Sequence, residues 1–233
     1  MKILEFESLP STNDYAKAHA EEGDMIVTAK RQTAGRGSKN RSFDSGMGGV
    51  YLTKMTFYPD FPASDVFRIM TDSSVAVCRT MEDFGLSPSI KWPNDVFVGG
   101  KKICGILIEN AFSGERVSRS VVGIGVNVQN DLPEQLQGIA TTMKAERGDP
   151  PDTEEVKKRL IFHLQERYPL SDYVANLTFL GQKIVLVRGG ERCVVTAKAV
   201  DEKGRLIVEN GAGRVEAVAA GEVSLRFLEE GTR

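Results

Sequence analysis

The segment 91–109 gathers side chains that can bind and activate an anionic substrate. Two apolar runs, 96–98 and 103–108, flank the turn sequence Gly-Gly-Lys-Lys at 99–102 and predict a β-hairpin. The polar residues expected near the mouth of this hairpin are Lys91, Asn94, Asp95 and Lys102. Lysines bind phosphate or carboxylate oxygens, an aspartate suits a magnesium ion or an incoming amine, and an asparagine suits either. The combination favours activation of an acid by a nucleotide.

Lys102 is the most specific of these candidates. Lys101 and Lys102 are neighbours on a predicted strand, so their side chains point to opposite faces of the sheet. The lysine that faces inward needs an anion, because an unpaired buried charge is costly. The other three residues are less specific, since an Asn-Asp pair beside a proline also forms structural turns and ion pairs.

A second cluster of polar residues, 32–41, follows a strand-like run at 25–29. It contains Gly35 and Gly37, which let the main chain approach a ligand, and three cations, Arg36, Lys39 and Arg41. The spacing differs from that of a Walker A motif, and no helical pattern follows as in a dinucleotide-binding fingerprint. The segment is therefore expected to be a mobile, anion-binding loop.

Glycines within predicted strands and hydroxyls at a helix start are further candidates. Gly105, Gly123 and Gly125 interrupt apolar strands, where glycine weakens packing, so each is expected to mark close approach of the backbone to a ligand. Ser11 and Thr12 begin a predicted helix. From position alone, a capping role is favoured over a ligand contact for these two hydroxyls.

The pattern of elements predicts an α+β fold with a mixed sheet. Helices are expected at 11–22 and 64–84, the second capped by Ser64, and a polar loop at 146–152 leads to a helix capped by Asp152. Trp92 is expected to fill the core. Strands are expected at 25–29, 50–57, 90–92, 96–108 and 118–128. Helices interrupt these strands without a regular βαβ rhythm, which argues against a doubly wound parallel sheet.

The pattern changes after Phe179, where five short strands alternate with tight turns. They are expected at 183–188, 192–200, 205–209, 215–218 and 223–227. Short strands in so small a region favour a barrel, because an open sheet would expose its edges. We therefore divide the chain into a domain at 1–178 and a small barrel at 179–233.

Composition narrows the classes of function. The chain of 233 residues is 41% hydrophobic and 27% charged, with a formal net charge of −2, which argues against general nucleic-acid binding. The sequence has neither an apolar run of membrane-spanning length nor a signal-peptide pattern, so a cytoplasmic protein is expected. The three cysteines, Cys78, Cys104 and Cys193, are far apart and suggest neither disulfides nor a zinc site.

Taken in order, the motifs resemble those of the biotin protein ligase family. They are Ser11-Thr12-Asn13, Gly35-Arg36-Gly37, Lys91-Trp92-Pro93-Asn94-Asp95, the segment 102–107, Gly123-Ile124-Gly125-Val126-Asn127, and the small C-terminal domain. The resemblance implies a class II synthetase-like catalytic domain followed by an SH3-like barrel. It also implies ATP-dependent formation of biotinyl-adenylate, and then transfer of biotin to a lysine of a biotin carboxyl carrier protein.

The resemblance assigns roles to individual residues. Ser11, Thr12 and Gln32 would bind the ureido ring of biotin, Arg36 would bind the biotin carboxylate and then the adenylate phosphate, and Asn127 would contact adenine. Lys91, Arg36, Lys102 and magnesium would offset phosphate charge, while Asp95 would orient or deprotonate the carrier lysine and offer a contact to Mg²⁺. The remaining ligand-binding positions implied are Asn13, Gly35, Gly37, Ser38, Lys39, Arg41, Asn94, Gly105, Gly123 and Gly125.

The sequence departs from the family in the loop. Many members continue Gly-Arg-Gly with Arg-Arg-Gly-Arg, whereas this chain has Ser38-Lys39-Asn40-Arg41, and Phe43 replaces a frequent tryptophan. The loop would still shield the adenylate from water. Two other functions remain open: lipoyl or octanoyl transfer on a related fold, and a biotin-binding module without catalysis. Neither DNA nor a membrane is expected as a partner, and a homodimer paired through sheet edges is one option that the family offers.

Overall fold

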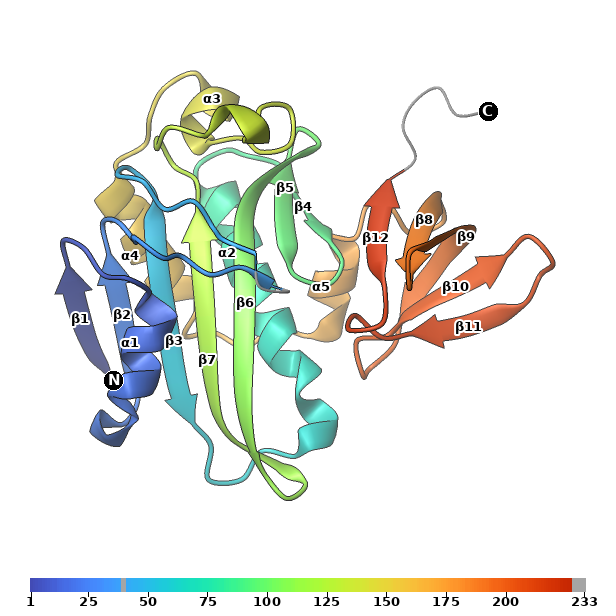
Figure 1. The fold of residues 1–233 in the computed structure, drawn as a ribbon, viewed down its shortest axis with the longest axis horizontal. Coiled ribbons are helices and arrows are strands. Elements are labelled where there is room, and N and C mark those ends of the chain that lie inside the picture. The colour runs from blue at the N-terminus through green and yellow to red at the C-terminus, as the bar shows by residue number, and fades with distance from the viewer. Residues whose placement is uncertain (39–40, 228–233) are drawn as a thin grey trace.

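The computed structural model describes residues 1–38 and 41–227, which form two sheets with helices packed on the larger one (Figure 1). The larger sheet has seven strands in the order β1-β2-β3-β7-β6-β5-β4, and the smaller has five in the order β11-β10-β9-β8-β12. In the described part of the larger sheet, β1 and β2 pair in parallel and the other neighbouring strands pair antiparallel. The predicted mixed α+β fold is confirmed.

Most strands of the larger sheet lie where the sequence predicts them. β2 (Met25–Ala29) and β3 (Val50–Phe57) match, and the hairpin consists of β5 (Asp95–Val98) and β6 (Lys101–Ser113). β4 (Pro88–Lys91) and β7 (Arg116–Val126) begin two residues earlier than expected and end sooner. β1 (Lys2–Phe6) was not predicted, because Lys2 and Glu5 leave only a short apolar alternation.

The two faces of the sheet pack against different helices. α1 (Thr12–Ala18) lies in front of the sheet, where Ala16 packs with Met25 and Val27, whereas α2 (Phe67–Asp83) lies behind it (Figure 1). Ile26, which lies between those two residues in β2, instead joins the core that α2 covers. The strand alternation therefore separates a small front core from a large rear core. α4 (Thr153–His163) and α5 (Leu170–Ala175) also pack against α2.

Three predicted helix boundaries need correction. The helix expected at 11–22 is α1 followed by a separate 3₁₀ turn, Ala20–Glu22. Ser64 does not cap α2, because its hydroxyl bonds the Asp65 carboxylate in a preceding 3₁₀ turn and α2 begins after Val66. The loop expected at 146–152 overlaps a short helix, α3 (Met143–Arg147). The cap by Asp152 is confirmed, since its carboxylate accepts a hydrogen bond from the Glu154 N–H at 3.0 Å.

The C-terminal strands form an antiparallel sheet that is joined to the larger domain. They are β8 (Lys183–Arg188), β9 (Glu191–Val200), β10 (Leu206–Asn210), β11 (Val215–Val218) and β12 (Ser224–Phe227). Trp92 is 3% exposed, as expected for a core residue, and its indole N–H donates a hydrogen bond to the Gly204 carbonyl at 2.9 Å. Closure of this sheet into a barrel stays a prediction. Among the described residues, no helix is both long and apolar enough to cross a membrane.

Candidate active site

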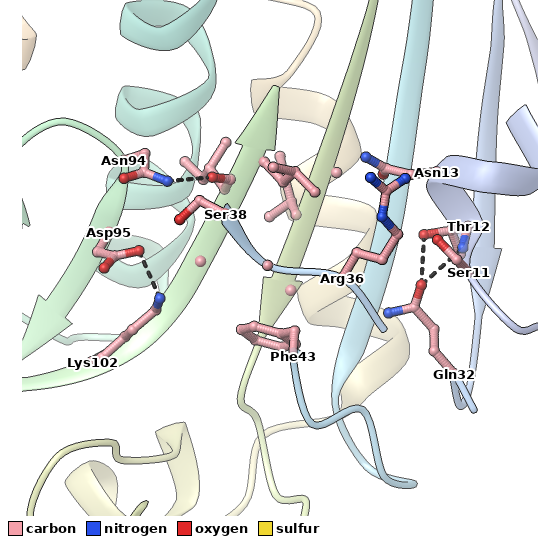
Figure 2. Close-up of a pocket in the computed structure, with 17 residues that line it drawn as sticks. Ser11, Thr12, Asn13, Gln32, Arg36, Ser38, Phe43, Asn94, Asp95 and Lys102 are labelled. Carbon is pink, nitrogen blue, oxygen red and sulfur yellow. Dashed lines mark hydrogen bonds and ion pairs between the residues drawn. The ribbon is translucent and has the colours of Figure 1, made fainter. Parts of the chain in front are cut away.

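A cavity opens on the front face of the larger sheet, between α1, the loop after β2 and the strands β6 and β7 (Figure 2). The space between its lining residues, which includes open solvent at the mouth, is about 490 Å³. The structure brings most of the predicted residues together here. Those lining the cavity are Ser11, Thr12, Asn13, Gln32, Arg36, Gly37, Ser38, Asn94, Asp95, Lys102, Gly105, Gly123 and Gly125.

One end of the cavity is a network of hydroxyls and amides. Ser11 caps α1, since its hydroxyl accepts a hydrogen bond from the Asp14 N–H at 3.3 Å. The N–H and the hydroxyl of Thr12 both donate to Gln32 Oε1, at 2.8 and 3.0 Å (Figure 2). Gln32 Nε2 in turn donates to the Ser45 hydroxyl at 2.9 Å. This end is pre-formed by bonds within the protein and offers mixed donors and acceptors to a polar ligand.

Three members of this network were not predicted: Ser45, Thr53 and Glu109. The Thr53 hydroxyl, fully buried in β3, donates to Asn13 Oδ1 at 2.6 Å and lies 2.8 Å from the Thr12 hydroxyl. Asn13 Nδ2 donates to Glu109 Oε2 at 3.0 Å. A threonine with its hydroxyl on the packed face of an apolar strand was a signal in the sequence, because a buried hydroxyl needs a partner.

Arg36 lies at the α1 end of the cavity, between two carboxylates. Its guanidinium is 2.7 Å from Asp14 Oδ1 and 3.3 Å from Glu109 Oε1, and the bond to Asp14 is the largest cause of its raised pKa. Burial raises the pKa of Glu109, but hydrogen bonds from Asn13 and Lys17 together with the charges of Lys17 and Arg36 outweigh it, so the net pKa is lowered. Figure 2 places the Arg36 side chain beside Asn13 and away from Lys102. The guanidinium was predicted to bind an anionic ligand, but in this structure it is paired with two carboxylates of the chain itself.

The other end of the cavity holds the ion pair of the hairpin. Lys102 Nζ lies 2.7 Å from Asp95 Oδ1, while Lys101 is exposed, so the predicted opposite orientation of the two lysines is confirmed. Asn94 Nδ2 donates to the Ile106 carbonyl at 2.6 Å, and the Asn94 carbonyl accepts from the Ile106 N–H at 3.1 Å. Asn94 therefore braces the hairpin, and Lys102 with Asp95 is the charged pair at this end of the cavity.

The three strand glycines make room for side chains of the protein. A Cβ on Gly123 would lie 2.2 Å from Asn13 Oδ1, and one on Gly125 would lie 2.4 Å from the Phe43 ring. At Gly105 the neighbours are Lys102 Nζ and the Phe43 ring, both at 3.1 Å. Close approach to a ligand stays a prediction, and the groups nearest to these glycines in the structure are Asn13, Phe43 and Lys102. The glycines thus shape the cavity through these side chains.

A second cavity adjoins the first and shares several residues with it. Phe43, Asp95 and Lys102 line both, so the Phe43 ring and the ion pair form the wall between the two chambers. Arg41 and Lys91 line only the second, whose apolar wall, not anticipated from the sequence, is Phe97, Leu132, Leu136, Ile139 and Ala140. Asn127 also lines it, with its amide donating to the Thr141 carbonyl at 3.2 Å. Lys39 lies outside the described residues.

The site and fold agree with a known family. Residues 5–127 match the Biotin/lipoate A/B protein ligase family, which is more than half of the chain, so the chain belongs to that family. Residues 179–226 match the biotin protein ligase C-terminal domain.

Relatives and solved structures cover nearly the whole chain. The Bifunctional ligase/repressor BirA of Bacillus subtilis is 29% identical over 92% of this chain and 70% of its own length. The Biotin–[acetyl-CoA-carboxylase] ligase of Mycobacterium tuberculosis is 29% identical over 91% of this chain and 85% of its own. A solved biotin protein ligase from Aquifex aeolicus, in complex with biotin and ATP, has a TM-score of 0.78 at 26% identity and covers 97% of this chain and 99% of its own.

Proposed function

We propose that the protein is an ATP-dependent ligase that attaches biotin to a lysine of a biotin carboxyl carrier protein. The observation that carries this proposal is the pair of chambers divided by Phe43, Asp95 and Lys102. One chamber ends in the amide and hydroxyl network of Thr12, Asn13 and Gln32, which suits a ureido ring. The other has cations and an apolar wall, which suit phosphates and a base. A carboxylate and a phosphate bound in this way would meet at Lys102.

The first step joins the two substrates at that junction. An oxygen of the biotin carboxylate attacks the α-phosphorus of ATP, the bond from that phosphorus to the bridging oxygen breaks, and pyrophosphate leaves. Lys102 and Lys91 would stabilise the charge that develops on the phosphoryl oxygens. Arg36 would add to them once it exchanges Asp14 for the ligand, and its planar guanidinium can bind a carboxylate or phosphate through two bonds.

The second step transfers the acyl group to the carrier. The amine of the carrier lysine attacks the acyl carbon, the bond to the phosphate oxygen breaks, and AMP leaves. Asp95 is the carboxylate at the junction, and we assign it to orient the incoming amine or to accept its proton. Magnesium would arrive with ATP and bind mainly phosphates and water. The Asp95 carboxylate would share such an ion with Lys102, whose Nζ lies 2.7 Å from Asp95 Oδ1.

Pyrophosphate release tests this function directly. The protein would be mixed with ATP and magnesium, together with biotin, lipoate or octanoate in parallel. Of the three acids, we expect only biotin to give rapid release of pyrophosphate. A purified carrier domain added afterwards should then become biotinylated. Release with lipoate or octanoate in preference to biotin would reassign the substrate. If no acid gives pyrophosphate release but the protein still binds biotin, the protein is a biotin-binding module without catalysis.

The serine in the loop predicts a leaky intermediate. Ser38 lines both chambers where many family members have arginine, and its side chain and carbonyl are bonded by Arg41 at 3.1 and 3.2 Å. A hydroxyl supplies neither the charge nor the reach of a guanidinium. We therefore expect Ser38→Arg to slow the release of preformed biotinyl-adenylate by about 10-fold, the effect of one modest charge-assisted contact.

The measurement is the rate at which adenylate leaves the protein in the absence of carrier. Ser42→Arg, which adds the same charge to a residue of the second chamber alone, is the matched control. Equal release from the natural protein and Ser38→Arg would mean that Arg41 or another group already retains the intermediate.

A homodimer paired through the outer strands β1 or β4 stays a prediction.

A further inference from the structure

Lys91 is held between two aromatic rings that come from different sheets. Its Nζ lies 5.4 Å from the centroid of the Phe97 ring in β5 and 5.3 Å from that of the Phe227 ring in β12. Both distances are within the range of cation–π attraction. The two rings stand nearly perpendicular, at 89°, with centroids 6.3 Å apart. Lys91 is thus a cation of the second chamber that is held partly by the C-terminal sheet.

The choice of aromatic partners matters for a phosphate-binding cation. Burial lowers the pKa of Lys91, so some interaction must offset the desolvation of its ammonium. A carboxylate would do so but would also neutralise the charge and compete with phosphate. The charge of Asp95 offsets part of the desolvation of Lys91, but this carboxylate is already paired with Lys102 at 2.7 Å. Ring faces stabilise the ammonium and leave its N–H groups free to bind an incoming anion.

Phe227 packs against rings from both parts of the chain, Phe97 in the larger sheet and Phe179 at the start of the C-terminal region. Phe179 packs against it with ring centroids 6.0 Å apart. Next to Lys91 in sequence, Trp92 donates its indole N–H to the Gly204 carbonyl, which belongs to the C-terminal region. The segment that carries Lys91 is therefore attached to the C-terminal region at two adjacent residues, through a hydrogen bond from Trp92 to the turn after β9 and through the contact of Lys91 with the Phe227 ring.

We propose that Phe227 is a positioning residue that holds the Lys91 ammonium toward the nucleotide phosphates, so that the C-terminal sheet completes the ATP site. This inference rests on the proposed ATP-dependent function and extends it to a residue outside the motifs. On this proposal, the C-terminal region contributes to ATP binding through one aromatic ring, Phe227, which acts on one lysine, Lys91.

The test compares Phe227→Ala, Phe227→Tyr and Phe227→Leu in the full chain, by ATP affinity and by the kinetics of pyrophosphate release. We expect alanine to weaken ATP binding and raise the KM for ATP by about 3- to 30-fold, the span of cation–π contributions, with little change in the KM for biotin. Tyrosine keeps the ring and should restore the natural values. Leucine keeps apolar volume without a ring face and should not.

A double-mutant cycle with Lys91→Met shows whether the ring acts through the lysine. If it does, Phe227→Ala should cost almost nothing once Lys91 is methionine. Trp92, the single tryptophan of the chain, reports the domain contact independently, and its emission should stay that of a buried indole in every variant. Phe112→Ala, at an exposed phenylalanine near the far end of β6, is the matched control and should change nothing.

Three outcomes would overturn the inference: an unchanged ATP affinity in Phe227→Ala, full rescue by leucine, or an undiminished effect of Phe227→Ala in the Lys91→Met background. Failure of the proposed function looks different. In that case the natural protein releases no pyrophosphate with any acid, while direct ATP binding still responds to alanine and tyrosine at position 227.

Discussion

Lys102→Ala is expected to slow pyrophosphate release with biotin and ATP by about 100-fold, while the fold stays intact. One lost charge-assisted contact costs about 1.5–3 kcal/mol, or roughly 10- to 100-fold in rate. We expect the upper end of this range for a specific reason. Lys102 is the partner of Asp95 at 2.7 Å, so its removal also leaves a partly buried carboxylate without its cation, next to the anionic substrates. The loss should fall on kcat for adenylate formation more than on the affinity for biotin.

Lys101→Ala is the matched control for this experiment. The two lysines are adjacent in β6, but Lys101 is exposed and its removal leaves the Asp95 pair untouched. Both variants should keep the circular dichroism spectrum of the natural protein. Lys102→Arg would retain the charge and should recover part of the rate. If Lys102→Ala releases pyrophosphate as fast as Lys101→Ala, Lys102 has no part in the reaction.

Gly123→Ala is expected to weaken biotin binding by about 30- to 100-fold. The added Cβ would lie 2.2 Å from Asn13 Oδ1, and Asn13 cannot move freely because it is bonded to Thr53 and Glu109 at 2.6 and 3.0 Å. The clash would therefore displace the whole polar network, and overpacking of this kind costs about 1–3 kcal/mol. Biotin affinity can be measured by calorimetry without ATP, and ATP binding alone should change little.

Gly211→Ala is the control, because a Cβ there meets no atom within 4 Å and no positive φ has to be maintained. Gly125→Ala offers a second contrast, since its Cβ would meet the Phe43 ring between the chambers and should perturb the junction more than the network. Natural biotin affinity in Gly123→Ala would show that Asn13 can relocate at little cost, and would remove the network from the binding site.

Several features of the fold could be predicted because local rules decide them. The strands Met25–Ala29 and Val50–Phe57 are rich in β-branched and aromatic residues. Gly23 and Gly85, with φ of 82° and 75°, follow the 3₁₀ turn Ala20–Glu22 and α2 respectively. Lys101 and Lys102 must point to opposite faces on any strand. β1 and α3 were missed because each is only five residues long, too short to show a clear period.

The partners of the charged residues could not be predicted. Arg36 was expected to face a ligand, yet it lies against Asp14 and Glu109, which come from α1 and β6. Several cations and carboxylates near a site can pair in many ways, and the choice depends on distances that only helix docking and strand register fix. The same holds for Lys91, whose partner ring at Phe227 lies on the last described strand.

The sequence by itself therefore determined the class of fold, the motif order and the inward orientation of Lys102, because periodicity, turns and strand alternation act over a few residues. The tertiary structure decided which groups meet. Thr53 and Glu109 entered the site through the pairing of β3, β7 and β6, and Phe43 entered it because Gly105 and Gly125 leave space beneath the ring. Contacts between distant segments depend on packing of the whole chain, and no local pattern encodes them.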